Sequence, residues 1–230
     1  MRWLTLLVLV LTPALARAQE GEAEKLFRAM EKKLLAAKSL TLEFATEFDA
    51  DGKTATVKGT ITIDADNKLR FEAVGKGVGV PNAKILELTN GDKVFEKTGD
   101  MIAAKPGSPR KSKTVLGIIA RANATTALFE KKKYQAGPLD IDEDFPVKNF
   151  KLGVKEMVGK REAQVVHYEY LRSKLLYSHA VWIDAKTQLP LKRNFSFTTA
   201  KGITLRTADI YSVFTVDSKL DGKLFEIPPK

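Results

Sequence analysis

Alternation of apolar and polar residues predicts that most of this chain forms antiparallel β-strands. Residues 40–48, 54–64 and 69–73 each place apolar side chains at alternate positions, with polar side chains between them. Because successive side chains of a strand point to opposite faces, this pattern predicts a sheet with one dry face and one wet face. Segments rich in Asp, Gly and Asn separate the strands, as expected of consecutive hairpins.

A second block of strands, residues 155–197, forms the longest predicted meander. Turns are expected at residues 158–160, 172–174 and 184–187. Residues 163–171 carry apolar or aromatic side chains on both faces. A meander of this length has to curl around an apolar filling or close on itself. What fills its concave face is therefore the functional question.

Two segments show helical periodicity instead. In residues 22–38 apolar side chains recur at the spacing of one helix face, with acidic residues early and lysines late, which suits the helix dipole. Residues 114–133 carry a wider apolar stripe, and we expect Asn123 and the threonines after it to divide this segment into two shorter helices. The chain is thus predicted to have an N-terminal helix and a helical insert between two blocks of strands.

Two further segments resemble ligand-binding motifs without meeting their requirements. Residues 75–81 are rich in glycine but lack the Gly-Lys-Ser/Thr sequence and the helix that a phosphate-binding loop needs. The acidic residues within 137–146 lack the glycine turn and the bidentate glutamate of a calcium loop. The first segment is predicted to be a loop or an irregular edge of the sheet, and the second an acidic surface loop.

The N-terminal segment has the features of a secretory signal peptide. Arg2 provides a positive start, a short apolar run follows, and Ala16-Arg17-Ala18 forms a cleavage site before Gln19. We therefore expect cleavage after Ala18 and export to a bacterial periplasm. Removal of Arg2 and Arg17 lowers the net charge from +10 to +8.

The composition leaves little for catalysis or metal binding. The chain has no cysteine, which excludes disulfides, thiolate nucleophiles and cysteine-ligated metals. Its two histidines, His167 and His179, cannot make a multi-histidine metal site, and we expect them to be structural or surface residues. The chain has no nucleophile elbow and no zinc-protease motif. We therefore expect no enzymatic activity, no catalytic residue, no metal and no cofactor.

Four motifs follow one another in a set order along the chain. They are Leu40-Thr41-Leu42-Glu43-Phe44, residues 57–63 (VKGTITI), Ala180-Val181-Trp182-Ile183-Asp184 with Leu189-Pro190-Leu191, and a closing segment over residues 220–229. This order resembles the LolA/LolB-like superfamily of lipoprotein-sorting proteins of the periplasm and outer membrane. The resemblance implies an α+β fold: an unclosed, curved antiparallel β-barrel, with an N-terminal helix and central helices plugging the concave side. It also implies a single domain over residues 19–230 after a signal peptide at 1–18, with a helical insert at about 112–133.

The resemblance also carries an expectation of function. In characterised members the hollow receives the acyl chains of lipoproteins, which implies a lipid or an acylated protein as partner and a carrier role. Carrier members have an Arg-Pro pair at the turn after the second strand; this chain has Ala65-Asp66 there, so no role for an arginine is carried over. The superfamily also contains regulatory sensor domains. The alternative is therefore a periplasmic sensor or interaction domain whose hollow is filled by its own side chains.

Nine apolar residues are candidates for the wall of a ligand cavity. They are Leu42, Phe44, Ile61, Ile63, Phe71, Leu116, Ile119, Phe195 and Phe197. The same residues fit a packed core, so both interpretations stay open. An empty apolar hollow costs about 20 cal/mol per Å² of its surface, so a pocket needs a movable plug or a resident ligand. The apolar stripe of the insert suits a plug.

Two basic clusters flank the insert. Arg110, Lys111 and Lys113 precede it, and Lys131, Lys132 and Lys133 follow its apolar stripe. Such clusters can dock on an anionic membrane surface, at about 1 kcal/mol per basic residue, or they can form a solvated rim. We expect no nucleic-acid partner, because the protein is predicted to be exported, and we expect a monomer.

Overall fold

The computed structural model describes residues 4–78, 82–91, 93–99, 101–105, 111–129, 140–172 and 175–228. In chain order the elements are α1 (Leu4–Ala36), β1 (Ser39–Ala50), β2 (Lys53–Asp64), β3 (Lys68–Gly77), β4 (Lys84–Asn90), β5 (Val94–Thr98), β6 (Met101–Lys105), α2 (Ser112–Arg121), α3 (Ala124–Phe129), α4 (Ile141–Asp144), β7 (Val147–Val158), β8 (Arg161–Arg172), β9 (Leu175–Asp184), β10 (Pro190–Thr198), β11 (Thr204–Val216) and the 3₁₀ helix η1 (Gly222–Phe225). In the described parts, no helix is both long enough and apolar enough to cross a membrane.

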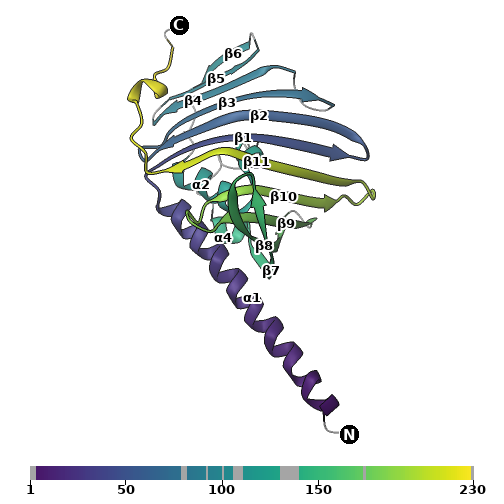
Figure 1. Ribbon diagram of the computed structural model, residues 1–230. Coiled ribbons are helices and arrows are strands. Elements are labelled where there is room, and N and C mark those ends of the chain that lie inside the picture. Colours follow the sequence, from purple (N-terminus) through teal and green to yellow (C-terminus); the bar gives the residue numbers. More distant parts are fainter. Residues whose placement is uncertain are drawn as a thin grey trace.

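The strands form one antiparallel sheet that curves without closing. Their order is β6-β5-β4-β3-β2-β1-β11-β10-β9-β8-β7, so two meanders meet where β1 pairs with β11. The two ends of the sheet, β6 and β7, are not paired with each other. The sheet bends over α2 and α4, and the early part of α1 extends away from it (Figure 1). The predicted fold class, an unclosed half-barrel with helices on its concave side, is confirmed.

The core lies between the concave face of the sheet and the helices. In one row across the sheet, Leu42 on β1 lies opposite Phe214 on β11 and Ile61 on β2, and Ile61 lies opposite Phe71 on β3. These residues belong to one buried cluster that also includes the apolar stripe of α2. Each fully buried large apolar side chain stabilises the fold by about 1.5–3 kcal/mol. The alternation read from the sequence therefore identifies the inner face correctly.

A buried arginine joins three helices. The Arg121 guanidinium, at the end of α2, forms ion pairs with Glu31 of α1 and with Asp142 of α4. Its Nη1 also donates to the carbonyl oxygens of Ile141, at 2.6 Å, and Phe145, at 3.0 Å. The hydrogen bond from Arg121 lowers the pKa of the Asp142 carboxyl. The position of α2 over the sheet thus depends on one desolvated cation.

The helices differ from the sequence expectation in three places. The N-terminal helix begins at Leu4 and not near residue 22, and it ends at Ala36. The helical insert divides at Ala122 and Asn123, as predicted for Asn123, but Thr125 and Thr126 lie within α3, and α2 begins at Ser112. The prediction of a loop over 137–146 is wrong for residues 141–144, which form α4. The Asp140 carboxylate caps this short helix, because it accepts hydrogen bonds from the backbone N–H groups of residues 142 and 143. Residues 137–139, and residues 130–133 of the insert, lie outside the described part.

The glycine-rich segment is also partly a strand. Within the loop or irregular edge expected over 75–81, residues 75–77 continue β3 and pair with residues 55–57 of β2, beyond the last pair of the β3–β4 register at Val74. Gly77 has φ +116°, and a Cβ there would lie 2.7 Å from the Cα of Ala55. The close approach of β2 therefore requires glycine at this position. Residues 79–81 lie outside the described part.

We predict that Arg121→Met lowers the free energy of unfolding by about 3–5 kcal/mol, because it leaves Glu31 buried without this partner. Arg121 and Glu31 have side chains only 3% and 7% exposed. Lys155→Met is the control, because it removes an exposed ion pair with Glu162 and should cost less than about 1 kcal/mol. Urea unfolding followed by circular dichroism measures both. Equal losses in the two variants would contradict this role of Arg121.

Candidate functional site

Seven of the nine predicted cavity residues lie in the sealed core. They are Leu42, Phe44, Ile61, Ile63 and Phe71 on β1 to β3, and Leu116 and Ile119 on α2, none more than 4% exposed. The wall strands and α2 contribute to the same buried cluster, so this half of the concave face is closed by the protein's own side chains.

The other two predicted residues lie in a different environment. Phe195 and Phe197 on β10 are only half-buried and are not part of the core cluster. They share the inner face of the sheet with Tyr177 of β9, which is also half-buried. We call these three residues the aromatic strip. It lies toward the ends of the strands where β8–β9 and β10–β11 form their hairpins.

The rings of the aromatic strip are in mutual contact. The ring centroids of Tyr177 and Phe197 are 4.7 Å apart, those of Tyr177 and Phe195 6.2 Å, and those of Phe195 and Phe197 6.5 Å. Leu205 of β11 lies opposite Phe197 and is half-buried too. These side chains together form a partly open apolar surface on the concave wall, which is the kind of surface that receives the apolar part of a ligand.

His179 borders the strip at its inner end. Its ring stacks on Tyr168 at 4.9 Å and on Phe195 at 5.3 Å, and the side chain is 4% exposed. Neither ring nitrogen has a hydrogen-bond partner. Burial, reinforced by the charge of Arg193, holds the pKa of His179 well below its usual range. His179 is therefore a neutral, buried histidine, whereas His167 is exposed. The expectation of structural or surface histidines fits both environments.

Arg193 connects the wall to the end of α2. It lies on the inner face of β10, 1% exposed, opposite Asp209 of β11. Its guanidinium donates to the Ala120 carbonyl oxygen at 2.9 Å and to the Tyr168 hydroxyl, and that hydroxyl donates to the Arg121 carbonyl oxygen at 2.8 Å. A cation at the C-terminus of a helix interacts favourably with the helix dipole.

Asp209 connects the wall to the start of α3. Its Oδ2 accepts from the Tyr211 hydroxyl at 3.2 Å, and the Thr46 hydroxyl and the backbone N–H of Ala124 lie nearby and favour the ionised carboxylate. The Thr46 and Thr125 hydroxyls are 2.8 Å apart, which adds a second link to α3. Burial raises the pKa of Asp209 to about 7, although these hydrogen bonds and the charge of Arg193 act in the opposite direction.

We call Arg193, Asp209, Thr46 and Tyr168 the polar band. It attaches α2 and α3 to the concave wall, and none of the residues predicted for the site belongs to it. The strand alternation indicates the polar band, because it places Arg193 on the same face as Phe195 and Phe197. It likewise places Asp209 on the same face as Tyr211. A charged residue at an inward position of a strand is expected to have a specific partner inside the fold.

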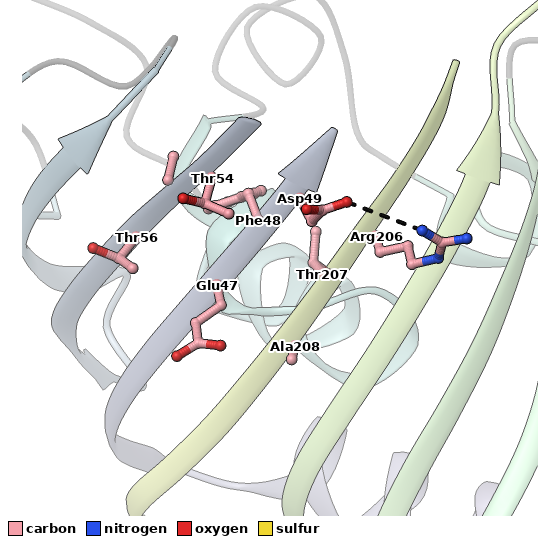
Figure 2. A pocket seen from close by; sticks show the side chains of 9 residues that line it. Glu47, Phe48, Asp49, Thr54, Thr56, Arg206, Thr207 and Ala208 are labelled. Atoms are coloured by element: carbon pink, nitrogen blue, oxygen red, sulfur yellow. Dashed lines mark ion pairs between the residues drawn. The ribbon is translucent and has the colours of Figure 1, made fainter. Parts of the chain in front are cut away.

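The opposite face of the sheet carries a shallow groove of about 400 Å³, shown in Figure 2. Its sides come from polar residues at the hairpin ends of β1, β2 and β11, and Arg206 and Asp49 form an ion pair across it at 4.0 Å. Glu47 and Thr56 also line it. The groove is open, its lining also includes Phe48, Ala55, Thr207 and Ala208, and it contains none of the predicted cavity residues.

Two of the six predicted membrane-docking residues are in described regions. Lys111 and Lys113, beside the start of α2, are exposed. Arg110, Lys131, Lys132 and Lys133 lie outside the described residues. Across the described ranges, no group of three or more His, Asp or Glu side chains is placed to hold a metal ion.

Comparison with known proteins supports the fold. No protein-family model matches the sequence, and no curated protein matches it. The structure is similar to that of LprF from Mycobacterium bovis, with a TM-score of 0.52 at 10% identity over 87% of this chain and 96% of that chain. A LolA superfamily protein from Nitrosomonas europaea gives a TM-score of 0.36 at 12% identity, over 89% of this chain and 97% of that one.

A third similar structure is MucB, with a TM-score of 0.45 at 11% identity over 90% of this chain. The match spans 63% of the MucB chain, which is less than two thirds of it. The same protein has been crystallised in complex with MucA(peri). At these identities the comparisons show the fold alone. The similarity to LprF agrees with the curved, unclosed sheet described above.

We predict that Asp209→Asn changes how stability depends on pH. The raised pKa of Asp209 means that its contribution to stability is fully present below about pH 4 and is lost as the pH rises through about 7. The D209N side chain does not titrate. Between pH 5 and pH 8 the unfolding free energy of the parent should therefore fall relative to the variant, by on the order of 2–3 kcal/mol.

Urea unfolding of both proteins at the two pH values measures this shift. His179 titrates in both proteins, so its opposite effect below about pH 6.5 cancels in the comparison. A difference between parent and variant that stays constant from pH 5 to pH 8 would show that Asp209 keeps an ordinary pKa.

Proposed function

We propose that this protein is an exported, periplasmic carrier that shelters a lipophilic ligand, such as the acyl chain of a lipid or of an acylated protein, on the concave wall of its half-barrel. The observation that carries the proposal is the aromatic strip. It is an apolar surface on the concave wall that α2 and α3 leave half-exposed. An acyl chain that leaves water gains about 0.8 kcal/mol per buried CH₂ group, so useful affinity needs no ionic anchor.

The remainder of a long acyl chain needs more room than the strip offers, and we infer that α2 and α3 move to provide it. These helices have 10 and 6 residues, and helices this short are marginal without tertiary contacts. Apolar packing and the Arg121 ion pairs also hold α2, and the polar band adds a small set of directional bonds, which can open and re-form. The plug role of the insert over 112–133 remains part of this proposal.

The second candidate is a periplasmic sensor or interaction domain with a self-filled core. The burial of seven of the nine predicted cavity residues favours it, because those residues already make the contacts that a ligand would make. In that case the protein works through a surface, and α2 and α3 stay in place. The two candidates differ in whether the concave wall takes up a ligand.

Both candidates are non-enzymatic and monomeric, with no metal, cofactor or nucleic-acid partner. The signal peptide at residues 1–18 with cleavage after Ala18, and the single domain at 19–230, belong to the same proposal. Docking on an anionic membrane through Lys111, Lys113 and the other basic residues flanking the insert would bring the carrier to its lipid source.

The carrier proposal is tested by locking the plug. The Thr46 and Thr125 hydroxyl oxygens are 2.8 Å apart, so paired Thr46→Cys and Thr125→Cys substitutions place two sulfurs near disulfide distance in a chain that has no other cysteine. We predict that the reduced double variant binds a fluorescent fatty-acid probe, and that oxidation lowers the affinity at least tenfold.

The single Thr46→Cys variant, treated with the same oxidant, controls for unspecific effects. Equal binding by the oxidised and reduced double variants would show that the plug does not move. Failure of the parent protein to bind the probe, together with the absence of lipid by mass spectrometry after purification without detergent, would favour the interaction domain.

A second prediction concerns the aromatic strip itself. Phe197→Asp places a carboxylate on the inner wall and should weaken probe binding at least tenfold, because the charge has to be desolvated by an apolar ligand. Ile210→Asp is the matched control, since Ile210 is 52% exposed and lies on the outer face of neighbouring β11.

Ile210→Asp should change probe affinity less than twofold. Thermal unfolding of both variants verifies that each remains folded. Equal loss of binding in the two variants would remove the aromatic strip from the site.

A further inference from the structure

Four buried side chains beside the aromatic strip have polar atoms without a hydrogen-bond partner among the residues that the structure describes. These atoms are both ring nitrogens of His179, Nε of Arg193, Oγ1 of Thr207 and Oδ1 of Asp209. All four residues are at most 4% exposed. They come from β9, β10 and β11, which are adjacent strands, and they share the inner face of the sheet. Unpartnered polar atoms are uncommon inside proteins, and four residues of this kind on one wall indicate a common reason.

The strand register places these residues around the inner end of the strip. Phe195 lies opposite His179 on one side and opposite Thr207 on the other. Arg193 and Asp209, two residues further along β10 and β11, lie opposite each other. These four residues are at most 4% exposed while α2 and α3 are in place. When the helices move, a molecule with its apolar chain on Phe195 and Phe197 would therefore end among these four side chains.

The fold gains no hydrogen bond from these particular atoms. Each of them has lost its water on burial, and an apolar group of the same shape would avoid that cost. Arg193 and Asp209 use their other atoms to hold α2 and α3, but Nε and Oδ1 remain available. A ligand that supplied the missing partners would recover the lost hydrogen bonds.

We propose that His179, Arg193, Thr207 and Asp209 form a subsite for an uncharged, hydroxyl-bearing head group, such as the glycerol of a monoacylglycerol, whose acyl chain lies on the aromatic strip. This inference rests on the proposed carrier function. The subsite presents donors, from Arg193 Nε and one ring nitrogen of His179, beside acceptors, from Asp209 Oδ1 and the other ring nitrogen. Thr207 can do either. Hydroxyl groups donate and accept at once, so they match both sets.

The charges on the wall argue against an ionic head group. A carboxylate or phosphate would lie close to the acceptor oxygen of Asp209, and an ammonium group would lie close to the guanidinium of Arg193. Arg193 and Asp209 lie opposite each other and offset each other's charge. Burial opposes any further charge here, as the depressed pKa of His179 and the raised pKa of Asp209 both indicate. A neutral head group is not repelled by Asp209 or Arg193, and its burial does not require the desolvation of a charge.

The test compares ligands that share a C16 chain and differ only in the head group. Displacement of a fluorescent fatty-acid probe is measured for 1-monopalmitoylglycerol, methyl palmitate, palmitate and hexadecyltrimethylammonium. We expect 1-monopalmitoylglycerol to bind about tenfold more tightly than methyl palmitate, which accepts hydrogen bonds but cannot donate them. We expect the two charged ligands to bind more weakly than 1-monopalmitoylglycerol.

Thr207→Val then tests the subsite at constant shape. Loss of one net hydrogen bond should reduce the preference for 1-monopalmitoylglycerol over methyl palmitate about fivefold. His179→Phe, which keeps the aromatic stacking, should reduce the same preference. Thr215→Val is the control on an exposed position of β11 and should leave the preference intact.

The unfolding midpoint of Thr207→Val provides a readout that does not depend on ligand. Because the hydroxyl has no partner, the midpoint should stay the same or rise. A marked fall would show that this hydroxyl supports the fold, and would overturn its assignment to a ligand.

The outcomes separate this inference from the proposed function. If none of the four ligands displaces the probe and the parent protein does not take the probe up, the carrier function fails and the subsite with it. If methyl palmitate binds as tightly as 1-monopalmitoylglycerol, or if Thr207→Val leaves their ratio unchanged, only the subsite fails. If palmitate binds most tightly, the head group is anionic and the inference of a neutral one is wrong.

Discussion

The structure depends on the attachment of two short helices to the concave wall of an open sheet. Arg193 binds the carboxyl end of α2 and Asp209 binds the amino end of α3, so each wall charge lies at the helix end whose dipole it complements. An unclosed sheet with a bare apolar inner face would not be stable in water. The plug covers this face through apolar packing, and the polar band determines where the plug lies.

This arrangement divides the concave wall into two parts. Under α2 the wall is sealed, because the side chains of β1 to β3 and of the helix fill the space between them. At the hairpin ends of β9 and β10 the wall carries the aromatic strip, whose side chains are only half-buried. Buried polar atoms without partners lie at the boundary, where ordinary packing would place apolar groups. A binding protein needs such a boundary between stable core and accessible surface. A fully packed wall leaves no space for a ligand, and an empty apolar cavity destabilises the fold.

The fold was largely predictable from the sequence, because strand alternation and helical periodicity are local patterns. Leu42, Ile61 and Phe71 were assigned to the inner face from alternation, and the register places them in one row. The division of the helical insert at Asn123 was also readable. Local patterns failed at α4, where hydrogen bonds to the Asp140 carboxylate form a short helix within a predicted loop.

By itself the sequence determined the class of fold, its inner face and a set of apolar residues on that face, because burial follows from side-chain chemistry and period. It did not determine which of those residues are sealed and which stay accessible. Phe71 and Phe197 look alike in sequence, yet the first is covered by packing and the second is not. That difference, and the meeting of Arg193 and Asp209 with helices about 70 to 85 residues away along the chain, arise only when the sheet curves and the plug docks. The physical reason is that exposure and hydrogen-bond partnership are properties of long-range contacts, which no local spacing encodes.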